Sequence, residues 1–117
     1  MNTRIHARCP IRTTFDLVGG KWRLLLLAQL SRSEMRYSEL SQAVPELSEK
    51  VLAQELRHLQ DNHLVIAEQS GRTKRYRLTD AGWAALPLID AMSTFAHAYE
   101  NRAYPDTVLD SFDVPKS

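Results

Sequence analysis

Residues 37–78 constrain the fold of this chain more than any other segment, because two helical patterns and two strand patterns follow one another there without a long loop. Tyr37, Leu40 and Val44 repeat at helical spacing, and Pro45 ends that short helix. Ser48 then provides an N-cap for a longer helix. The apolar stripe of this longer helix consists of Val51, Leu52, Leu56 and Leu59. A short helix that leads into a longer one through a brief turn predicts a helix-turn-helix.

A β-hairpin with a basic tip follows the longer helix. Residues 64–67 and 74–78 have the composition of strands, and residues 70–71 predict the turn between them. Side chains alternate along a strand, so Tyr76 and Leu78 share one side of the second strand. A hairpin in this place is a wing, and the order of elements is that of a winged helix-turn-helix.

Three further helices complete the expected architecture. Residues 11–18 form a short helix that closes at the glycines 19–20, which readily take the left-handed conformation. Residues 21–30 are apolar nearly all round, as expected for a helix at the centre of a small core. Residues 80–100 form a last long helix, in which Pro87 predicts a kink or a break. The expected fold is therefore mostly α with a small β-hairpin.

The net charge of the chain hides an uneven distribution. With 117 residues, 44% hydrophobic and 25% charged, the composition fits one soluble globular domain. The formal net charge of +1, taken for the whole chain, argues against a nucleic-acid partner. However, residues 1–77 hold 13 basic and 8 acidic side chains, whereas residues 78–117 hold 2 basic and 6 acidic ones. The small net charge is a cancellation between a basic part and an acidic part.

Neither a membrane span nor a disulfide framework is expected. The longest apolar run, residues 24–28, is far shorter than a transmembrane helix, and residues 1–8 lack the apolar segment of a signal peptide. We therefore expect a cytoplasmic protein with no membrane partner. The chain has a single cysteine, Cys9, which excludes an intrachain disulfide and a zinc site made of several cysteines.

Five separate blocks of sequence resemble one family, the HxlR-type winged helix-turn-helix regulators, which are relatives of the MarR group. The blocks are Cys9-Pro10, Leu17 to Trp22 with the leucines at 24–27, Arg36 to Leu40, Lys50 to Leu52 with Leu56, Arg57 and Leu59, and Tyr76 to Thr79 with Gly82. The resemblance covers about residues 9–107, which leaves an N-terminal arm at 1–8 and an acidic tail at 108–117. It implies a homodimeric DNA-binding transcriptional repressor or activator that reads a palindromic operator.

The chain departs from the family pattern at several positions. Around the glutamine of the longer helix, Ala53 and Glu55 stand where the family usually has a hydroxyl residue and a basic residue. Attraction to phosphate at position 55 would therefore be reversed. Asn62-His63 replaces the usual Asp-Gly after this helix, and the wing is a few residues shorter than in the family.

The longer helix carries the candidate base-reading residues. A recognition helix reads base edges from its N-terminal, solvent-facing side, and helical spacing places Ser48, Lys50, Gln54 and Arg57 there. Glutamine can pair with adenine through two hydrogen bonds and arginine with guanine, so Gln54 and Arg57 are the leading base readers. Any solvated helix also exposes lysine, glutamine and arginine, and this alternative stays open.

The hairpin supplies the candidate contacts with the DNA backbone. Four cations stand within six residues: Arg72, Lys74, Arg75 and Arg77. We expect Arg72, Lys74 and Arg75 to bind phosphates or the minor groove, with an affinity that falls steeply with salt. Alternatively, the charges protect an edge strand from aggregation. Arg36 and Ser38 are further candidates for phosphate contacts at the start of the shorter helix.

The last helix is the candidate dimer interface. Its apolar stripe consists of Leu88, Met92, Phe95 and Tyr99, and the same helix of a second copy would cover it through a two-fold contact. Alternatively, the helix folds back on its own core. A dimer would place two recognition helices about 34 Å apart, one turn of duplex.

Cys9 is the candidate sensing residue. Arg8, Arg12 and a helix start lie close to it in sequence, and cations and helix N-termini favour the thiolate. The resemblance implies a response to oxidants or electrophiles, so an oxidant or small-molecule effector of unknown identity is expected. A lone cysteine also occurs as a small buried hydrophobe, which is the alternative interpretation.

Other functional classes have little support in the sequence. The four histidines lack the spacing of metal ligands, Gly19-Gly20-Lys21 lacks the rest of a phosphate-binding loop, and no catalytic triad is evident. We therefore expect neither an enzyme nor a metal or cofactor. The serious alternative is a winged helix that binds another protein without sequence-specific DNA binding, an interpretation supported by Glu49 and Glu55 on the longer helix.

Overall fold

The computed structural model describes residues 9–101, which fall into two compact units. One unit ends at Leu86 and the other begins at Pro87. The expected N-terminal arm (1–8), the acidic tail (108–117) and residues 102–107 lie outside the described residues. Each unit is described below by itself.

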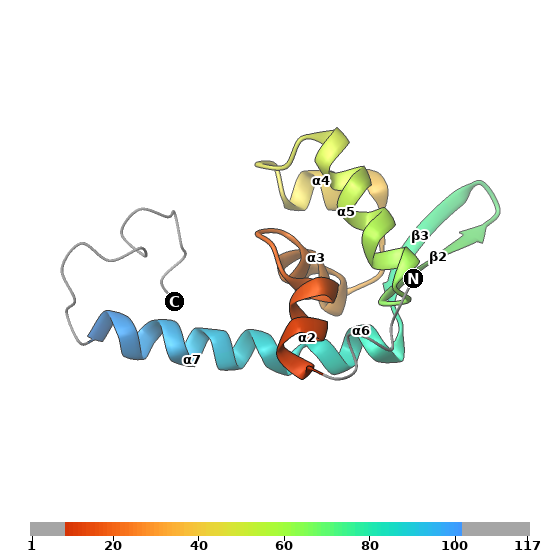
Figure 1. Cartoon of the computed structure of the whole chain (residues 1–117). Helices are drawn as coiled ribbons and strands as arrows, with labels where there is room; N and C mark the ends of the chain where they lie inside the picture. Colours follow the sequence, from red (N-terminus) through yellow and green to blue (C-terminus); the bar gives the residue numbers. More distant parts are fainter. Residues whose placement is uncertain (1–8, 102–117) are drawn as a thin grey trace. The chain divides into compact units, whose positions relative to one another are not determined.

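The first unit has the winged helix-turn-helix arrangement that the sequence predicts (Figure 1). Its elements are α2 (Pro10–Val18), α3 (Arg23–Arg32), β1 (Met35–Arg36), α4 (Tyr37–Ala43), α5 (Glu49–Asp61), β2 (Val65–Ser70), β3 (Thr73–Leu78) and α6 (Asp80–Ala85). The hairpin of β2 and β3 projects beyond the helices of this unit in Figure 1, as a wing does.

The core of this unit consists of leucines from α3, α4 and α5. The most deeply buried are Leu26, Leu27, Leu40, Leu52, Leu56 and Leu59. The central position of α3 is confirmed, although the helix begins at Arg23 and leaves Leu25 48% exposed. The sequence predicted a helix that is buried on nearly every side, but the side of α3 that carries Leu25 faces solvent. The prediction therefore overstated the burial of this helix.

The predicted closure of α2 at the glycines 19–20 is confirmed. Gly19, the C-cap residue, has a φ of −68° in the extended region, and its N–H donates to the Phe15 carbonyl. The positive φ of 102° falls on the next residue, Gly20. Gly20 thus makes the reversal into α3 outside the helix end, where a side chain at this φ would be strained.

The end of α5 uses a Schellman motif without glycine. Leu64 N–H donates to the Leu59 carbonyl at 2.9 Å, and His63 N–H donates to the Gln60 carbonyl at 3.0 Å. His63 occupies the left-handed position of this motif with a φ of 61°. The family usually has glycine at this position. Histidine has a Cβ atom, so it adopts the left-handed conformation only at an energetic cost.

The predicted hairpin is confirmed as β2 and β3, and a third strand that the sequence did not predict, β1, extends the sheet. The order is β1-β3-β2, with Met35 opposite Tyr76 and Ser70 opposite Thr73. Strand β1 has only two residues, too few to show a strand pattern in the sequence. The hairpin loop begins with Gly71, whose φ of 62° suits the first central position of a two-residue turn.

The predicted long helix is interrupted near Pro87. Thr79 caps α6 by accepting a hydrogen bond from the Gly82 N–H, and α6 ends at Ala85. The second unit begins with α7 (Pro87–Asn101), in which no residue is buried. Within the described residues, no helix is long and apolar enough to cross a membrane.

Candidate nucleic-acid interface

The polar face of α5 carries three of the predicted DNA contacts. Lys50, Gln54 and Arg57 are exposed, and their spacing of four and three residues places them on one side of the helix. The opposite side is anchored in the core by Leu52, Leu56 and Leu59. The helix thus presents a fixed row of donors to solvent, including the glutamine and arginine that can recognise bases.

Two hydrogen bonds fix the N-terminal end of α5. The predicted N-cap is confirmed, because the Ser48 Oγ accepts from the Val51 N–H at 3.1 Å. The Tyr37 hydroxyl, at the start of α4, donates to the Glu49 carbonyl oxygen at 2.7 Å. Desolvation and the nearby Glu49 carboxylate raise the pKa of Tyr37, which keeps this donor protonated. The two helices of the helix-turn-helix are therefore joined at the end expected to enter the groove.

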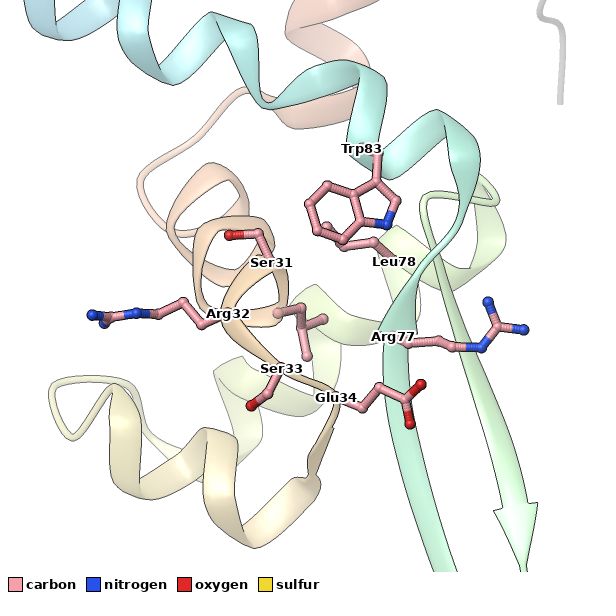
Figure 2. Close-up of a pocket in the computed structure, with 8 residues that line it drawn as sticks. Ser31, Arg32, Ser33, Glu34, Arg77, Leu78 and Trp83 are labelled. Carbon is pink, nitrogen blue, oxygen red and sulfur yellow. The ribbon is translucent and has the colours of Figure 1, made fainter.

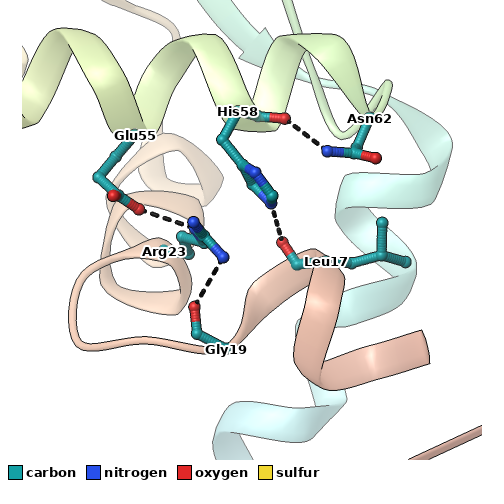
Figure 3. Close-up of polar contacts among 6 residues, drawn as sticks. All are labelled: Leu17, Gly19, Arg23, Glu55, His58 and Asn62. Carbon is teal, nitrogen blue, oxygen red and sulfur yellow. Dashed lines mark hydrogen bonds and ion pairs between the residues drawn. The ribbon is translucent and has the colours of Figure 1, made fainter. Parts of the chain in front are cut away.

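Glu55 does not have the environment that the sequence suggested. Its Oε1 accepts from Arg23 Nε at 2.8 Å, and the two side chains are only 22% and 23% exposed (Figure 3). The expected repulsion of phosphate by position 55 is thus countered by a cation of α3. The argument for a protein-binding module loses one of its two acidic residues, and of that pair Glu49 remains exposed.

Glu39 links the start of α4 to the wing. It accepts a hydrogen bond from the Arg36 backbone N–H at 2.8 Å, and its oxygens lie 3.5 Å from Arg36 Nη2 and 3.9 Å from Arg75 Nη1. The backbone hydrogen bond, followed by the two arginine charges, lowers the pKa of Glu39. Two predicted phosphate ligands from different elements, Arg36 and Arg75, are thereby brought together, whereas Ser38, which directly precedes Glu39, is exposed.

The wing cations divide into two kinds. Arg72 and Lys74 are exposed near the hairpin tip, where Lys74 Nζ lies 5.9 Å from the centre of the Tyr76 ring. Arg77, by contrast, binds both oxygens of Glu68 across the hairpin at 2.9 Å. This pairing lowers the pKa of Glu68 and raises the pKa of Arg77.

The position of β3 weakens the alternative explanation of the wing charges. Strand β3 is the middle strand, and Arg75 is paired with β1 on one side and β2 on the other. Positive charge at Arg75 is therefore not needed to protect an edge. Because β1 has only two residues, β3 has an open side at residues 73–74, near the tip, and at residues 77–78.

The first unit also has an open cavity of about 400 Å³ beside α6. Trp83, Leu78 and Leu30 form its apolar part, and Arg32 and Arg77 stand at its rim. Figure 2 shows both guanidinium groups pointing away from the Trp83 indole. The two arginines therefore do not converge on the apolar part of the cavity (Figure 2).

The predicted dimer stripe is largely exposed on α7. Met92 is 56% and Phe95 70% exposed, Leu88 and Tyr99 are half-buried, and the Phe95 and Tyr99 rings stack with centres 6.1 Å apart. Such a stripe needs an apolar surface to cover it. The structure places these four residues on one helix and leaves their partner as a prediction.

A second exposed apolar pair lies on α2 and was not identified in the sequence. Ile11 is 82% and Phe15 72% exposed, one turn apart. The helical spacing of these residues was noted, but periodicity cannot distinguish a stripe that faces the core from one that faces another chain. Cys9, at the N-cap of the same helix, is also exposed, which excludes its interpretation as a buried hydrophobe.

Within residues 9–101, no group of three histidine, cysteine, aspartate or glutamate side chains could hold a metal ion. The charged side chains described above instead form ion pairs or face solvent. The arrangement as a whole suits contact with a polyanion: exposed cations on α5 and the wing, with the nearby carboxylates Glu39, Glu55 and Glu68 each bound to arginine.

Comparison with known proteins decides the family. Residues 17–104 match the family model described as HxlR-like helix-turn-helix. The chain belongs to the HxlR-like helix-turn-helix family. It is 35% identical over 103 residues to the uncharacterized HTH-type transcriptional regulator YdzF of Bacillus subtilis, a match that covers 84% of this chain and 94% of the relative.

Solved structures of other regulators have the same fold. A MarR-family transcriptional regulator from Porphyromonas gingivalis is 37% identical with a TM-score of 0.70, covering 76% of this chain and 90% of that one. The quinone-bound transcriptional regulator YodB of B. subtilis is 28% identical with a TM-score of 0.68, covering 77% and 99%. As a member of this HxlR-like family, the chain is a DNA-binding transcriptional regulator.

Proposed function

We propose that this HxlR-like regulator binds a palindromic operator as a homodimer, with α5 in the major groove and the wing on the adjacent backbone. The observation that carries this proposal is the solvent-facing row of Lys50, Gln54 and Arg57 on a helix whose neighbouring acidic residue, Glu55, is bound to Arg23. Gln54 and Arg57 read base edges, and Ser48 and Lys50 contact the nearby backbone.

The phosphate contacts come from two other elements. Arg72, Lys74 and Arg75 of the wing are exposed, as such contacts require, and so are Arg36, the N-cap residue of α4, and Ser38 in the first turn of that helix. Phosphate contacts fix the register of a protein on the duplex and make affinity depend on salt, but they carry no sequence information. Arg77 has a different role, because Glu68 already binds its guanidinium.

Dimerisation in this proposal depends on the exposed apolar stripe Leu88, Met92, Phe95 and Tyr99 of α7. An isologous contact would bury the same stripe of both chains. The exposed pair Ile11 and Phe15 of α2 offers further apolar surface for the same purpose. Two linked recognition helices would bind a palindrome far more tightly than one, because the second half-site is engaged intramolecularly.

The proposed signal is an oxidant or an electrophile that reacts with Cys9. Its thiol is exposed at the N-cap of α2, where a reagent can reach it. The regulator YodB has been solved in a reduced form and in a quinone-bound form, which supports this class of effector for a similar chain. Modification at Cys9 would then shift the recognition helices and change operator affinity.

Selection of bound sequences from a random pool of duplexes tests the DNA-binding proposal. The wild-type protein is expected to enrich a palindrome, and binding to it should weaken steeply as salt rises. Failure to enrich any duplex, or binding that does not respond to salt, would favour the protein-interaction module instead. The enriched sequence, called the selected duplex below, then serves as the probe for every variant.

The sensing proposal has its own test. Binding of the selected duplex is compared before and after treatment with mild peroxide or a quinone, in the wild type and in Cys9→Ser. We expect the wild type to change its affinity and Cys9→Ser to keep it. An identical response of both proteins would remove Cys9 as the sensor.

A further inference from the structure

Two polar bridges join the side of α5 to the junction of α2 and α3 (Figure 3). Arg23 donates from Nε to Glu55 Oε1 at 2.8 Å and from Nη1 to the Gly19 carbonyl at 3.1 Å. His58 Nε2 lies 3.1 Å from the Leu17 carbonyl oxygen. A carbonyl only accepts hydrogen bonds, so this contact requires a proton on His58 Nε2.

The carbonyls in these bridges are ones that the end of a helix leaves without partners. Leu17 lies in the last turn of α2 and Gly19 is its C-cap, and the last carbonyls of a helix carry partial negative charge. Arg23 thus stands between the Gly19 carbonyl and the Glu55 carboxylate. Both side chains of the ion pair are mostly buried, so solvent screens their attraction less than at an open surface.

The position of these contacts on α5 gives them an orienting role. Glu55 and His58 are three residues apart and lie on the same side of the helix. Each directly follows a proposed base reader, Gln54 or Arg57, and so is rotated from it by about 100° around the helix axis. Holding Glu55 and His58 therefore sets the direction in which Gln54 and Arg57 point.

We propose that Arg23 and Glu55, with His58, form a latch that sets the rotation of the recognition helix and thereby its sequence specificity. Arg23 and Glu55 are positioning residues: in this proposal neither contacts DNA. The proposal rests on α5 as the DNA-reading helix. It also gives a function to the acidic residue that replaces the family's usual basic one at position 55.

The latch makes a prediction opposite to that of simple electrostatics. A carboxylate on a DNA-reading helix repels phosphate, so its removal should tighten binding to any duplex. The latch predicts that Glu55→Ala weakens binding to the selected duplex about five- to tenfold, although it removes a negative charge. Binding to a scrambled duplex should stay equal or become tighter, so that the ratio of the two affinities falls.

Glu49→Ala is the matched control, since Glu49 is an exposed acid on the first turn of the same helix and lies outside the latch. Its removal should leave the affinity ratio unchanged. Arg23→Ala should also weaken binding to the selected duplex, and the double variant Arg23→Ala/Glu55→Ala should bind no worse than Arg23→Ala alone, because both changes break the same contact. Glu55→Gln, which keeps the shape and one acceptor, should give an intermediate loss.

The measurements are fluorescence anisotropy titrations on both duplexes, with the folded fraction of each variant determined by circular dichroism. Tighter or unchanged binding of Glu55→Ala to the selected duplex would overturn the latch. So would an equal loss on both duplexes, which would mean only a smaller folded fraction. If the wild type enriches no duplex, the proposed function fails before any variant is compared.

Discussion

Helices α5 and α7 expose surfaces of opposite kinds. Helix α5 buries Leu52, Leu56 and Leu59 almost completely and presents a polar side to solvent. Helix α7 buries no residue and leaves Met92 and Phe95 more than half exposed. The apolar side of α5 is covered by its own chain, which leaves its polar side for a charged partner, whereas the apolar stripe of α7 still needs a cover.

The largest expected effect comes from breaking the α7 stripe. Phe95→Asp should abolish dimerisation, because a dimer would bury a carboxylate without a partner. Operator affinity should fall about a hundredfold or more with the loss of the second half-site. Sedimentation velocity measures the dimer and anisotropy the affinity. Thr94→Asp, which places the same charge off the stripe, is the control, and a dimeric Phe95→Asp would show that α7 has another role.

On α5, Arg57→Ala should weaken binding to the selected duplex roughly tenfold, since a bidentate contact with guanine is worth about 1–3 kcal/mol. The loss should be confined to sequences with the preferred base at one position of each half-site. A panel of single-base variants of the selected duplex measures this. An equal loss on every sequence would make Arg57 a phosphate ligand and not a base reader.

The wing offers a smaller, sequence-independent effect. Arg72→Ala should weaken binding to all duplexes by a few-fold and reduce the slope of log affinity against log salt by about 1 for each protomer. Arg77→Ala is a matched control on the same hairpin, because Glu68 already binds that guanidinium. Titrations at several salt concentrations compare the two variants. A larger change of slope for Arg77→Ala than for Arg72→Ala would mean that Arg77, and not Arg72, contacts phosphate.

Replacing the left-handed residue at the end of α5, His63, should make the protein more stable. His63→Gly should raise the free energy of unfolding by about 0.5–1 kcal/mol, because glycine adopts the left-handed conformation without the penalty that a Cβ atom brings. Thermal unfolding should show a rise of a few degrees in Tm. Asn62→Gly, at a position with negative φ, is the control and should destabilise the protein. A less stable His63→Gly would mean that the imidazole has contacts worth more than the strain.

The smallest expected effect concerns the acid limit of stability. The folded-state pKa of Glu68 is lowered, chiefly by its hydrogen bonds with Arg77. The ion pair of Glu68 with Arg77 therefore stabilises the folded protein above the ordinary glutamate pKa of about 4.3. This stabilisation is lost as the pH falls through the lower pKa that Glu68 has in the folded protein. Glu68→Gln should lower Tm slightly at pH 7 and make no difference at pH 2. A difference that persisted at pH 2 would rule out the ion pair as its cause.

Much of the fold was predictable because its elements are local patterns. The Ser48 cap, the α5 stripe, the turn after Ser70 and the break near Pro87 each depend on residues within a few positions of one another. Strand β1 was missed because a two-residue strand has no period, and its pairing partner lies about 40 residues further along the chain. Local reasoning cannot supply such a contact.

The candidate site was predictable in its residues but not in their pairing. Exposure of Lys50, Gln54 and Arg57 follows from helical spacing alone. The ion pair of Arg23 with Glu55 joins residues 32 positions apart, so the sequence suggested repulsion where the structure has a bound carboxylate. Which wing cation is engaged by a carboxylate likewise depends on the hairpin register, which places Glu68 opposite Arg75 and leaves Arg77 one diagonal away.

The most direct test of the account is a salt titration of the wild-type protein on the selected and scrambled duplexes. We predict that log affinity falls linearly with log salt on both, and that the selected duplex keeps the higher affinity at every salt concentration. Equal affinities for the two duplexes, or an affinity that does not change with salt, would contradict the assignment of α5 and the wing as the DNA-reading surface.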